Sequence, residues 1–501
     1  MRACPDKGNC VSLRKLFPNA KIVGADDIYV ASCTCDSRKV ESGDLFAALP
    51  GNMRDGLDFV GDAITRGCTA ILSQKPLEDT IDVPYCIVDD ARNAYGRICQ
   101  ATHGYPSSRL KVIGITGTNG KTTTSLLVTR ILARAGHKVG LVGTLGYYDG
   151  RRVEDASLTT PSAEKLASLF DRMVENGCTH AVLEVSSHAL DQARVAGIEM
   201  DVVCVTNVRR DHLDYHPTIQ DYQFSKSKLL DYLSAEGITI LNADDLTSAA
   251  YLHQINGPVL TVSMNATSEI SATMLEQQLS EQMFLLSAGS ESVPVRTKMI
   301  GEHHVYNCLI AAAVGLAYGT DLETIVQGLE SVEYVLGRLQ RLECGQPFGA
   351  FVDYAHTPDA LTVVLQTLRN VADGRLICVF GAGGDRDKQK RSLMGHAVEK
   401  LADLAVVTSD NPRSEDPQSI AEEIVVGFQQ PECAKVILNR ADAIQWALAE
   451  AKPGDCVLIA GRGHEKTQTV GEKQMRFDDY EIASRLLYEN QPRKVSVVDE
   501  N

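Results

Sequence analysis

The segment Gly114–Thr123, GITGTNGKTT, places three glycines beside a lysine and four threonines. It follows the apolar run KVIGIT and precedes leucine and isoleucine residues at helical spacing, which predicts a strand, a loop and a helix. In such a turn, glycine lets backbone N–H groups approach phosphate oxygens, and the helix dipole favours their negative charge. A strict nucleotide loop would have glycine where this chain has Ile115. We nevertheless predict ATP binding by Gly117, Thr118, Asn119, Gly120, Lys121, Thr122 and Thr123.

Two later apolar runs end in groups that suit a metal ion. HAVLEVSSH places Glu184 at a strand end, and VTNVRRDHLDYH supplies Asp211 and His212. Ligands of open α/β sheets bind at the carboxyl ends of the strands, so these groups should converge beside Lys121 and hold magnesium against phosphates. The alternatives are that Glu184 is a solvated strand end and that His212 only neighbours a helix cap.

A third cluster lies in the last part of the chain, in the motifs FGAGGDRDKQKR, SDNPR and GRGHE. They supply Arg386, Arg391 and Arg413, followed by Gly461 and Glu465. Arginine suits a carboxylate and a glutamate suits an ammonium, so the three motifs together predict an amino-acid pocket. Taken separately, each motif is also compatible with an ordinary loop turn.

The elements that would position these groups predict an α/β protein of three domains, within residues 1–106, 107–336 and 337–501. The first is a small α/β unit, and the second is a parallel-sheet nucleotide-binding unit. Between residues 257 and 299 its short alternating runs favour antiparallel strands. The third repeats strand and helix in a Rossmann-like manner.

Composition restricts the partners of the chain. Its 501 residues carry a net charge of −16, which argues against non-specific binding of nucleic acid or an anionic membrane. No uncharged apolar stretch reaches membrane-spanning length, and the first ten residues contain no apolar run of a secretory signal. We therefore expect a cytoplasmic, monomeric enzyme that acts on small molecules.

The motifs occur in the order of a known family. CDSRKVESGDLFAALPG, GITGTNGKTTT, LTTPS, EVSSHALDQARV, YQFSKSKLL, VDYAHTPDAL, GGDRDKQKR, DNPR and GRGHE resemble the Mur ligases of peptidoglycan synthesis from about Cys35 to Glu465. The resemblance implies successive domains for a UDP-linked substrate, for ATP and for an amino acid. It also implies that ATP phosphorylates the terminal carboxylate of UDP-N-acetylmuramoyl-L-alanyl-D-glutamate, and that an amine then displaces phosphate from the acyl phosphate.

The resemblance also assigns roles to individual residues. It implies that Lys121, Glu184, His212 and Lys226 are catalytic, with Mg²⁺ held by Thr122, Glu184, His212 and a CO₂-derived carbamate on Lys226 (N6-carboxylysine). Further ATP contacts would come from Asn307, Arg338 and Asp353. The UDP-muramoyl peptide would be bound by Ser37, Asn52, Met53, Arg54, Thr159, Thr160, Ser186, Gln192 and Arg194.

The motif DNPR resembles the form found in family members that add meso-diaminopimelate. That substrate has a second carboxylate, which can pair with Arg413 and Arg386, whereas L-lysine presents only an ammonium there. The implied binding set is Arg386, Asp410, Asn411, Pro412, Arg413, Gly461 and Glu465. The remaining alternatives are an L-lysine-adding ligase, a folylpolyglutamate-synthase-like ligase, a non-catalytic nucleotide-binding regulator and a small-molecule kinase.

One departure concerns the base of the nucleotide. The family has a Phe-Asn pair where this chain has His303 and His304, although Asn307 is retained. His304 either donates a similar hydrogen bond or is a surface residue.

Overall fold

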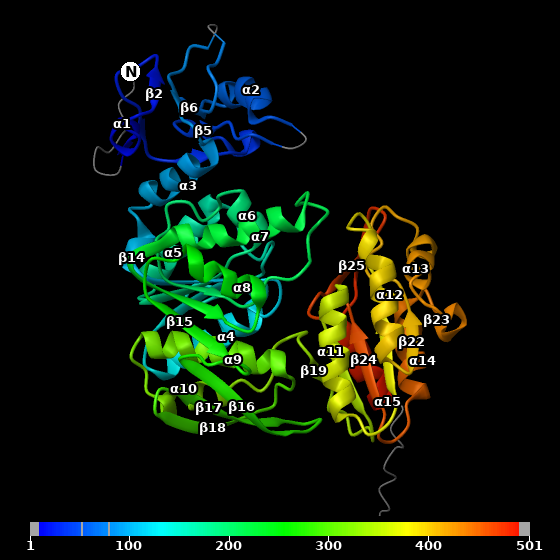
Figure 1. Cartoon of the computed structure of the whole chain (residues 1–501). Coiled ribbons are helices and arrows are strands. Elements are labelled where there is room, and N and C mark those ends of the chain that lie inside the picture. The colour runs from blue at the N-terminus through cyan, green and yellow to red at the C-terminus, as the bar shows by residue number, and fades with distance from the viewer. Residues whose placement is uncertain (1–9, 52–53, 79–80, 490–501) are drawn as a thin grey trace, which may run out of the picture.

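The protein was analysed as a computed structural model, which describes residues 10–51, 54–78 and 81–489. Its helices and strands form three successive α/β modules, running from blue at one end of the molecule through green to red (Figure 1). The α/β class predicted from the sequence is therefore confirmed.

The N-terminal module spans residues 11–102 and contains a five-stranded sheet of order β2-β7-β6-β5-β4, parallel from β4 to β7. Its elements are β1 Val11–Ser12, α1 Leu13–Leu16, β2 Lys21–Val23, β3 Tyr29–Val30, β4 Cys33–Thr34, η1 Ser37–Lys39, β5 Leu45–Ala47, η2 Gly56–Phe59, α2 Val60–Thr65, β6 Ala70–Ser73, β7 Tyr85–Ile87 and α3 Ala91–Thr102.

The central module begins after η3 Pro106–Arg109 and contains an eleven-stranded sheet of order β11-β10-β9-β12-β8-β13-β14-β15-β16-β17-β18. In the order of the sheet, the strands from β9 through β12, β8, β13, β14 and β15 to β16 pair in parallel. Strands β16, β17 and β18 form the predicted antiparallel part, and β9, β10 and β11 are antiparallel at the other edge. Its elements are β8 Lys111–Thr116, α4 Lys121–Arg134, β9 Val139–Gly143, β10 Gly146–Tyr148, β11 Val153–Glu154, α5 Ala163–Glu175, β12 His180–Glu184, α6 Ser187–Asp191, β13 Met200–Val205, α7 Ile219–Ser227, η4 Lys228–Tyr232, β14 Leu233–Asn242, α8 Leu246–Ala250, η5 Tyr251–Gln254, β15 Val259–Ser263, β16 Ile270–Gln277, β17 Gln282–Ala288, β18 Glu291–Thr297, α9 Glu302–Ala317 and α10 Leu322–Glu330.

The C-terminal module contains a six-stranded sheet of order β19-β20-β24-β21-β22-β23, in which all strands except β19 pair in parallel. Its elements are β19 Gln340–Arg341, β20 Gly349–Asp353, α11 Pro358–Val371, β21 Leu376–Phe380, α12 Gln389–Leu401, β22 Leu404–Val407, α13 Pro417–Val425, η6 Pro431–Cys433, β23 Ala434–Val436, α14 Arg440–Glu450, β24 Cys456–Ala460, β25 Thr467–Val470, β26 Lys473–Arg476 and α15 Asp479–Glu489.

Strand β8 lies between the two strands whose ends carry the predicted metal-binding residues. It pairs in parallel with β12 on one side and β13 on the other, and all its residues after Lys111 are buried. Glu184 lies opposite Ile115, and Val205 lies opposite Thr116, so the three strands end together. The polar residues that follow them are therefore brought to one edge of the sheet.

Helix α9 covers the helix that follows this strand. Its central residues are buried almost all around, as expected of a helix enclosed on several sides, and they share an apolar core with α4 and α10. This packing fixes the start of α9, at Glu302, relative to the loop before α4.

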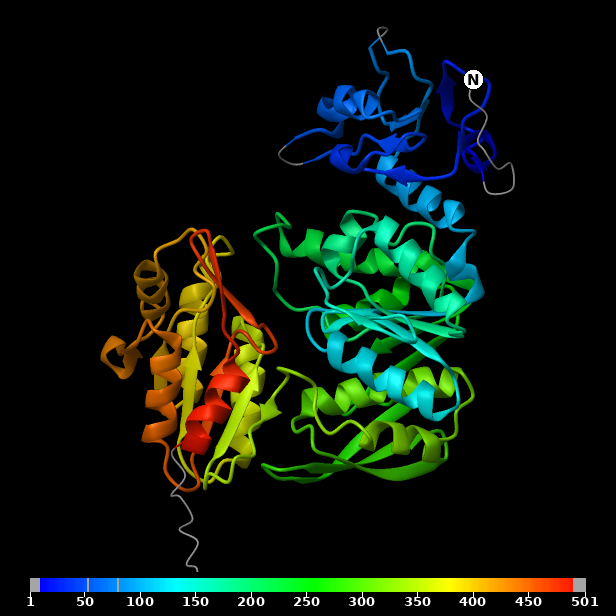
Figure 2. The same cartoon turned by 180° about the vertical axis from the view of Figure 1, so that it is seen from behind.

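The modules touch through a small number of specific contacts. Helix α3 packs against α5 of the central module, where the Tyr95 hydroxyl donates to Glu164 at 3.2 Å. On the other side, Asn119 of the central module donates to Asp359 of the C-terminal module at 3.3 Å. The view from behind shows the C-terminal module beside the central module and the N-terminal module at the far end of the central one (Figure 2).

Candidate active site

The loop between β8 and α4 has the backbone that phosphate binding requires. Gly120 caps α4 in the left-handed conformation, with φ of 86°, and a Cβ there would lie 2.3 Å from Asn307 Oδ1. Asn207, just after the end of β13, holds the loop in place. It accepts hydrogen bonds from the Thr118 N–H through its backbone oxygen at 2.8 Å and from the Asn119 N–H through Oδ1 at 3.0 Å. These two N–H groups are used to hold the loop, and the N–H groups at the start of α4, which have no partner within the helix, are the ones that can bind an anion without reordering.

Glu184 is a buried carboxylate, so the alternative of a solvated strand end is wrong. It is 1% exposed and accepts hydrogen bonds from the hydroxyls of Thr122 at 2.9 Å and Ser125 at 3.4 Å. Thr144 donates twice, through its N–H at 3.0 Å and its hydroxyl at 2.9 Å. Four hydrogen bonds fix the direction of the carboxylate beside the metal-compatible Thr122 hydroxyl.

Thr144 was missed by the reasoning from sequence. It follows β9, which pairs in parallel with β12, so its position beside Glu184 depends on the strand order. A signal was present, because Thr144 is the first polar residue after the apolar run VGLVG. The rule that functional groups follow strand ends would have selected it, had β9 been known to neighbour β12.

Two lysines converge on one oxygen of the loop. The Gly117 carbonyl accepts from Lys121 Nζ at 2.7 Å and from Lys226 Nζ at 2.8 Å. Lys226 is 1% exposed, although its position in α7 looks like that of an ordinary surface lysine in sequence. Burial, together with the charge of Lys121, holds the pKa of the Lys226 ammonium well below its usual value. Burial also lowers the pKa of Lys121.

His212 lies on the turn after β13, with a positive φ of 54°. Its Nε2 lies 3.5 Å from Asp211 Oδ2, and its ring meets the ring of His188 edge-on. Burial lowers the pKa of His212 to about 3, so the imidazole is neutral and has a lone pair for a cation. A neutral imidazole is compatible with the role of a metal ligand and equally with a residue that only neighbours a helix cap.

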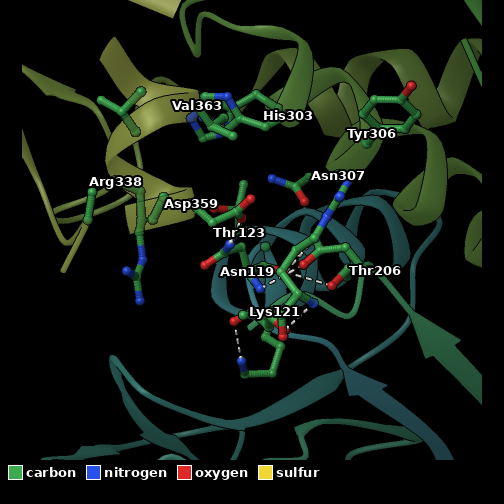
Figure 3. A pocket seen from close by; sticks show the side chains of 18 of the residues that line it. Asn119, Lys121, Thr123, Thr206, His303, Tyr306, Asn307, Arg338, Asp359 and Val363 are labelled. Atoms are coloured by element: carbon green, nitrogen blue, oxygen red, sulfur yellow. Dashed lines mark hydrogen bonds between the residues drawn. The ribbon is translucent and has the colours of Figure 1, made fainter. Parts of the chain in front are cut away.

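A cavity of about 510 Å³ opens onto the loop, Lys121, Thr122, Thr144 and His212, whereas Glu184 and Lys226 are not part of its lining. Its wall includes the phosphate loop, His212 and, from the C-terminal side, Arg338 and Asp353. Figure 3 shows Arg338, Asn307 and Lys121 reaching the same space from different segments. Arg338 donates to the Thr122 hydroxyl at 3.4 Å and lies over the Tyr354 ring at 4.4 Å.

Asp353 acts mainly on the backbone near Arg338. Its carboxylate accepts from the N–H groups of Leu339 at 2.5 Å and Ala355 at 2.6 Å. Burial raises the pKa of this carboxyl. The contacts thus fix the turn that carries Arg338 into the cavity.

The residues expected to hold the muramoyl peptide divide into two groups. Thr160, Ser186 and Arg194 are joined, since the Thr160 hydroxyl accepts from the Ser186 N–H at 3.0 Å and Arg194 donates to Thr160 O at 2.8 Å. Arg194 also donates to the Gln192 carboxamide at 2.8 Å, and Thr159 shares a hydrogen bond with Thr144 at 3.1 Å. These residues connect directly to the Glu184 site, through Thr160 and Glu184 O.

The remaining members lie in the N-terminal module. Ser37 is buried at the start of η1, and Arg54 is exposed. Neither lines the cavity in the part of the chain that the structure describes. Asn52 and Met53 lie outside the described residues.

The predicted amino-acid residues gather on the C-terminal module. A Cβ on Gly383 would lie 3.0 Å from Arg413 Nη1 and 3.7 Å from Arg386 Cγ, which places both arginines beside one loop. Asn411 donates to Glu465 at 2.7 Å, and burial and then the nearby Asp410 raise the pKa of Glu465.

Asp410 presents a carboxylate oxygen without a partner. Its Oδ2 is buried and makes no hydrogen bond in the described structure. Gly461, at φ of 115°, gives it room, since a Cβ there would lie 2.4 Å from this oxygen. Pro412 lies between Asn411 and Arg413 in the same turn. None of the seven residues predicted to bind diaminopimelate lines the 510 Å³ cavity. The nucleotide site and the predicted amino-acid site are therefore separate and do not share this pocket.

Arg391 does not belong to the amino-acid set. It is completely buried and donates to Glu415 at 2.9 Å, to Glu423 at 2.9 Å and to Gly383 O at 3.2 Å. These bonds tie the start of α12 to α13 through Glu423, to the segment before α13 through Glu415 and to the preceding loop through Gly383, which is a structural role. The prediction that placed Arg391 in the substrate cluster is therefore wrong.

His304 is buried at 2% exposure, so the alternative of a surface residue is also wrong.

Among the described residues, no helix combines the length and the apolar character that a membrane span requires.

The fold and the cavity together define a nucleotide-binding α/β protein with a third module beside its phosphate loop. Residues 29–103 match the Mur ligase family, catalytic domain, residues 115–315 match the Mur ligase middle domain, and residues 337–463 match the Mur ligase, glutamate ligase domain. The chain belongs to the Mur ligase family.

Two relatives match this chain over nearly its whole length and over nearly their own. The chain is 42% identical over 468 residues to the UDP-N-acetylmuramoyl-L-alanyl-D-glutamate--2,6-diaminopimelate ligase of Geobacillus kaustophilus (strain HTA426), which covers 92% of this chain and 95% of the relative. It is 40% identical over 467 residues to the ligase of the same name from Geobacillus thermodenitrificans (strain NG80-2), covering 92% and 95%.

Solved structures agree in fold. A structure of a UDP-N-acetylmuramoyl-L-alanyl-D-glutamate--2,6-diaminopimelate ligase is 30% identical, covers 96% of this chain and 99% of that chain, and has a TM-score of 0.68. The MurF ligase of Thermotoga maritima in complex with ADP is 17% identical with a TM-score of 0.62, covering 92% and 98%, which shows the shared fold alone.

Proposed function

We propose that the chain is an ATP-dependent amide ligase that joins meso-2,6-diaminopimelate to UDP-N-acetylmuramoyl-L-alanyl-D-glutamate. The observation that carries the proposal is the match of about 40% identity to ligases of that name over more than nine-tenths of both chains. ATP would convert the terminal carboxylate into an acyl phosphate, which the incoming amine attacks with loss of phosphate. This activation is needed because a carboxylate is a poor electrophile.

The residues of the cavity support the first step. The loop N–H groups and Lys121 suit the phosphates of ATP, and Arg338 can offset negative charge from the opposite side. The Asn119–Asp359 and Arg338–Thr122 contacts join the C-terminal module to the loop. The division of labour that we propose assigns the UDP-linked substrate to residues 1–106, ATP to 107–336 and the amino acid to 337–501.

Magnesium fits the oxygen-rich side of the cavity. Glu184, the Thr122 hydroxyl and the neutral His212 are the donors that this chain would contribute. No three acidic, histidine or cysteine side chains form a ready-made metal site among the described residues. We infer that phosphate oxygens complete the coordination, and a bound Mg²⁺ would offset charge during phosphoryl transfer.

We further propose that Lys226 is carbamylated. A neutral amine is the form that adds to CO₂, releasing one proton and leaving an N-bound carboxylate. Burial of Lys226 beside Lys121 favours that neutral form, and a carboxylate there would gain the ammonium of Lys121 as a partner.

The amino-acid residues support the acceptor. Arg413 and Arg386 suit the distal carboxylate of diaminopimelate, and Asp410 and Glu465 suit its distal ammonium. An L-lysine-adding ligase, the second candidate, would have no use for the arginine pair. We propose that the enzyme works in the cytoplasm, where its small water-soluble substrates would be available, and that it works as a monomer.

The test is a phosphate-release assay on the purified chain with ATP and Mg²⁺. We expect release, and a product heavier by one diaminopimelate residue, only when both UDP-N-acetylmuramoyl-L-alanyl-D-glutamate and meso-diaminopimelate are present. Equal turnover with L-lysine would refute the acceptor assignment. Absence of ligation with every amino acid tried would refute the ligase itself.

A further inference from the structure

The hairpin of β25 and β26 has no part in the proposed function so far. It begins just after the motif GRGHE and forms a two-stranded sheet of its own, and β25 lies along the turn Asp410–Arg413. Arg413 forms a parallel bridge with Val470. Its N–H donates to Thr469 O at 3.1 Å, and its carbonyl accepts from the Gly471 N–H at 2.6 Å. The hairpin therefore holds both backbone polar groups of Arg413.

The backbone conformation of Arg413 explains why the turn needs this support. Its φ of 52° lies in the left-handed region, which residues other than glycine rarely adopt and which persists only where surrounding contacts hold it. The direction of the Arg413 side chain follows from this backbone. Its Nη1 donates to Gly384 O at 2.6 Å, in the loop that leads to Arg386. A turn that relaxed would move the guanidinium away from this place.

One side chain of the hairpin reaches the start of the same turn. Gln468 is 6% exposed, and its Nε2 donates to the Asp410 carbonyl at 2.6 Å. Arg462 Nη1 also donates to this oxygen, but at 3.4 Å, so the carboxamide is the closer partner. The next residue, Thr469, donates its N–H to Asn411 Oδ1 at 2.9 Å. Among these contacts of β25, that of Gln468 is made by a side chain of the strand, so a substitution can remove it while the backbone contacts stay.

We propose that Gln468 is a positioning residue of the amino-acid site, which fixes the turn Asp410–Arg413 and thereby the direction of the Arg413 guanidinium. Gln468 acts through Arg413, so it sets the affinity of the enzyme for the distal carboxylate of the acceptor. The inference deepens the proposed function and rests on it for diaminopimelate being the acceptor. A role confined to stability would affect the whole C-terminal module and would not change this affinity selectively.

The test is steady-state ligation by the full chain, with the KM measured separately for meso-diaminopimelate, for ATP and for the UDP-linked substrate. Gln468→Met keeps an unbranched side chain of similar length and removes the donor. Gln468→Leu also removes it and serves if the methionine variant does not fold. The matched control is Gln474→Met, at an exposed position of β26 in the same hairpin, where the carboxamide donates to Thr467 Oγ1 at 3.0 Å.

We expect both Gln468 variants to raise the KM for diaminopimelate about three- to tenfold, the range of one hydrogen bond. Their kcat and their KM values for ATP and the UDP-linked substrate should stay close to those of the wild type, and Gln474→Met should change none of these constants. Because Gln468 acts through Arg413, adding Gln468→Met to Arg413→Ala should raise the KM for diaminopimelate no further.

The inference is overturned if the folded Gln468 variants keep the wild-type KM for diaminopimelate, or if all three KM values rise together. It is also overturned if the effects of Gln468→Met and Arg413→Ala multiply in the double variant, because the glutamine would then act independently of Arg413. Failure of the proposed function is distinguishable, since a wild type that ligates no diaminopimelate rejects that function and the inference with it. Wild-type ligation with an unchanged KM in the variants rejects only the role of Gln468.

Discussion

Replacing Thr144 by valine would remove one hydroxyl from the Glu184 site while leaving side-chain volume almost unchanged. The hydroxyl donates to Glu184 Oε2 at 2.9 Å and exchanges a hydrogen bond with Thr159 at 3.1 Å. The Thr144 N–H, Thr122 and Ser125 continue to donate to the carboxylate.

The magnitude follows from these contacts. A hydrogen bond to a charged group contributes about 1.5–3 kcal/mol, and the remaining donors should keep the loss near the lower end. Because about 1.4 kcal/mol corresponds to a factor of ten, the Mg²⁺ concentration for half-maximal ligation should rise roughly tenfold. That value lies within the 10- to 100-fold range typical of groups that orient a metal ligand.

The assay records ligation against Mg²⁺ concentration at saturating ATP for wild type, Thr144→Val and Thr144→Ser. Serine retains the hydroxyl, so its Mg²⁺ curve should stay close to that of the wild type. The reasoning is refuted if the valine variant, with an unchanged melting temperature, shows the wild-type Mg²⁺ dependence. It is equally refuted if serine and valine shift the curve by the same amount.

Three other substitutions test separate parts of the molecule. Lys226→Ala should lose most ligation activity and regain part of it with short-chain carboxylic acids, while wild type in ¹³C-bicarbonate should show a carbamate NMR signal; failure of both contradicts the carbamate. Arg413→Ala should raise the KM for meso-diaminopimelate at least tenfold and leave the KM for ATP unchanged, and an equal rise of both values would exclude a specific role. Asp479→Asn should lower the free energy of unfolding by about 3–5 kcal/mol in urea titrations, because it leaves the buried Arg440 guanidinium, now bonded at 2.7 and 2.8 Å, without its charge partner. A loss below 1 kcal/mol would show that solvent reaches Arg440.

The groups that follow single strands could be predicted from the sequence. Glycine, lysine and threonine after an apolar run define the loop at Gly117, and Glu184 ends the next parallel neighbour of β8. Local pattern suffices there, because parallel strands bring their carboxyl ends to one edge. Strand order, by contrast, comes from tertiary packing, and Thr144 depends on β9 lying beside β12.

Burial was the second quantity that the sequence could not supply. Arg386 and Arg391 occur five residues apart in one motif, yet Arg391 is completely buried between two glutamates and Arg386 is exposed near Asp214. Lys226 lies on a helix with hardly any amphipathic pattern, so neither its burial nor its contact with Gly117 could be derived from periodicity.

The shared contact at Gly117 connects the nucleotide site with the proposed carbamate. Two ammonium groups on one carbonyl oxygen lie within roughly 5 Å, where like charges repel by about 3 kcal/mol at an effective dielectric constant of 20. The repulsion is relieved if Lys226, the more deeply buried group, loses its proton. The resulting amine is the form that reacts with CO₂, and the carbamate then attracts Lys121 with an energy of the same size. The positive charge of Lys121 thus favours both the neutral form of Lys226 before carbamylation and the carboxylate after it.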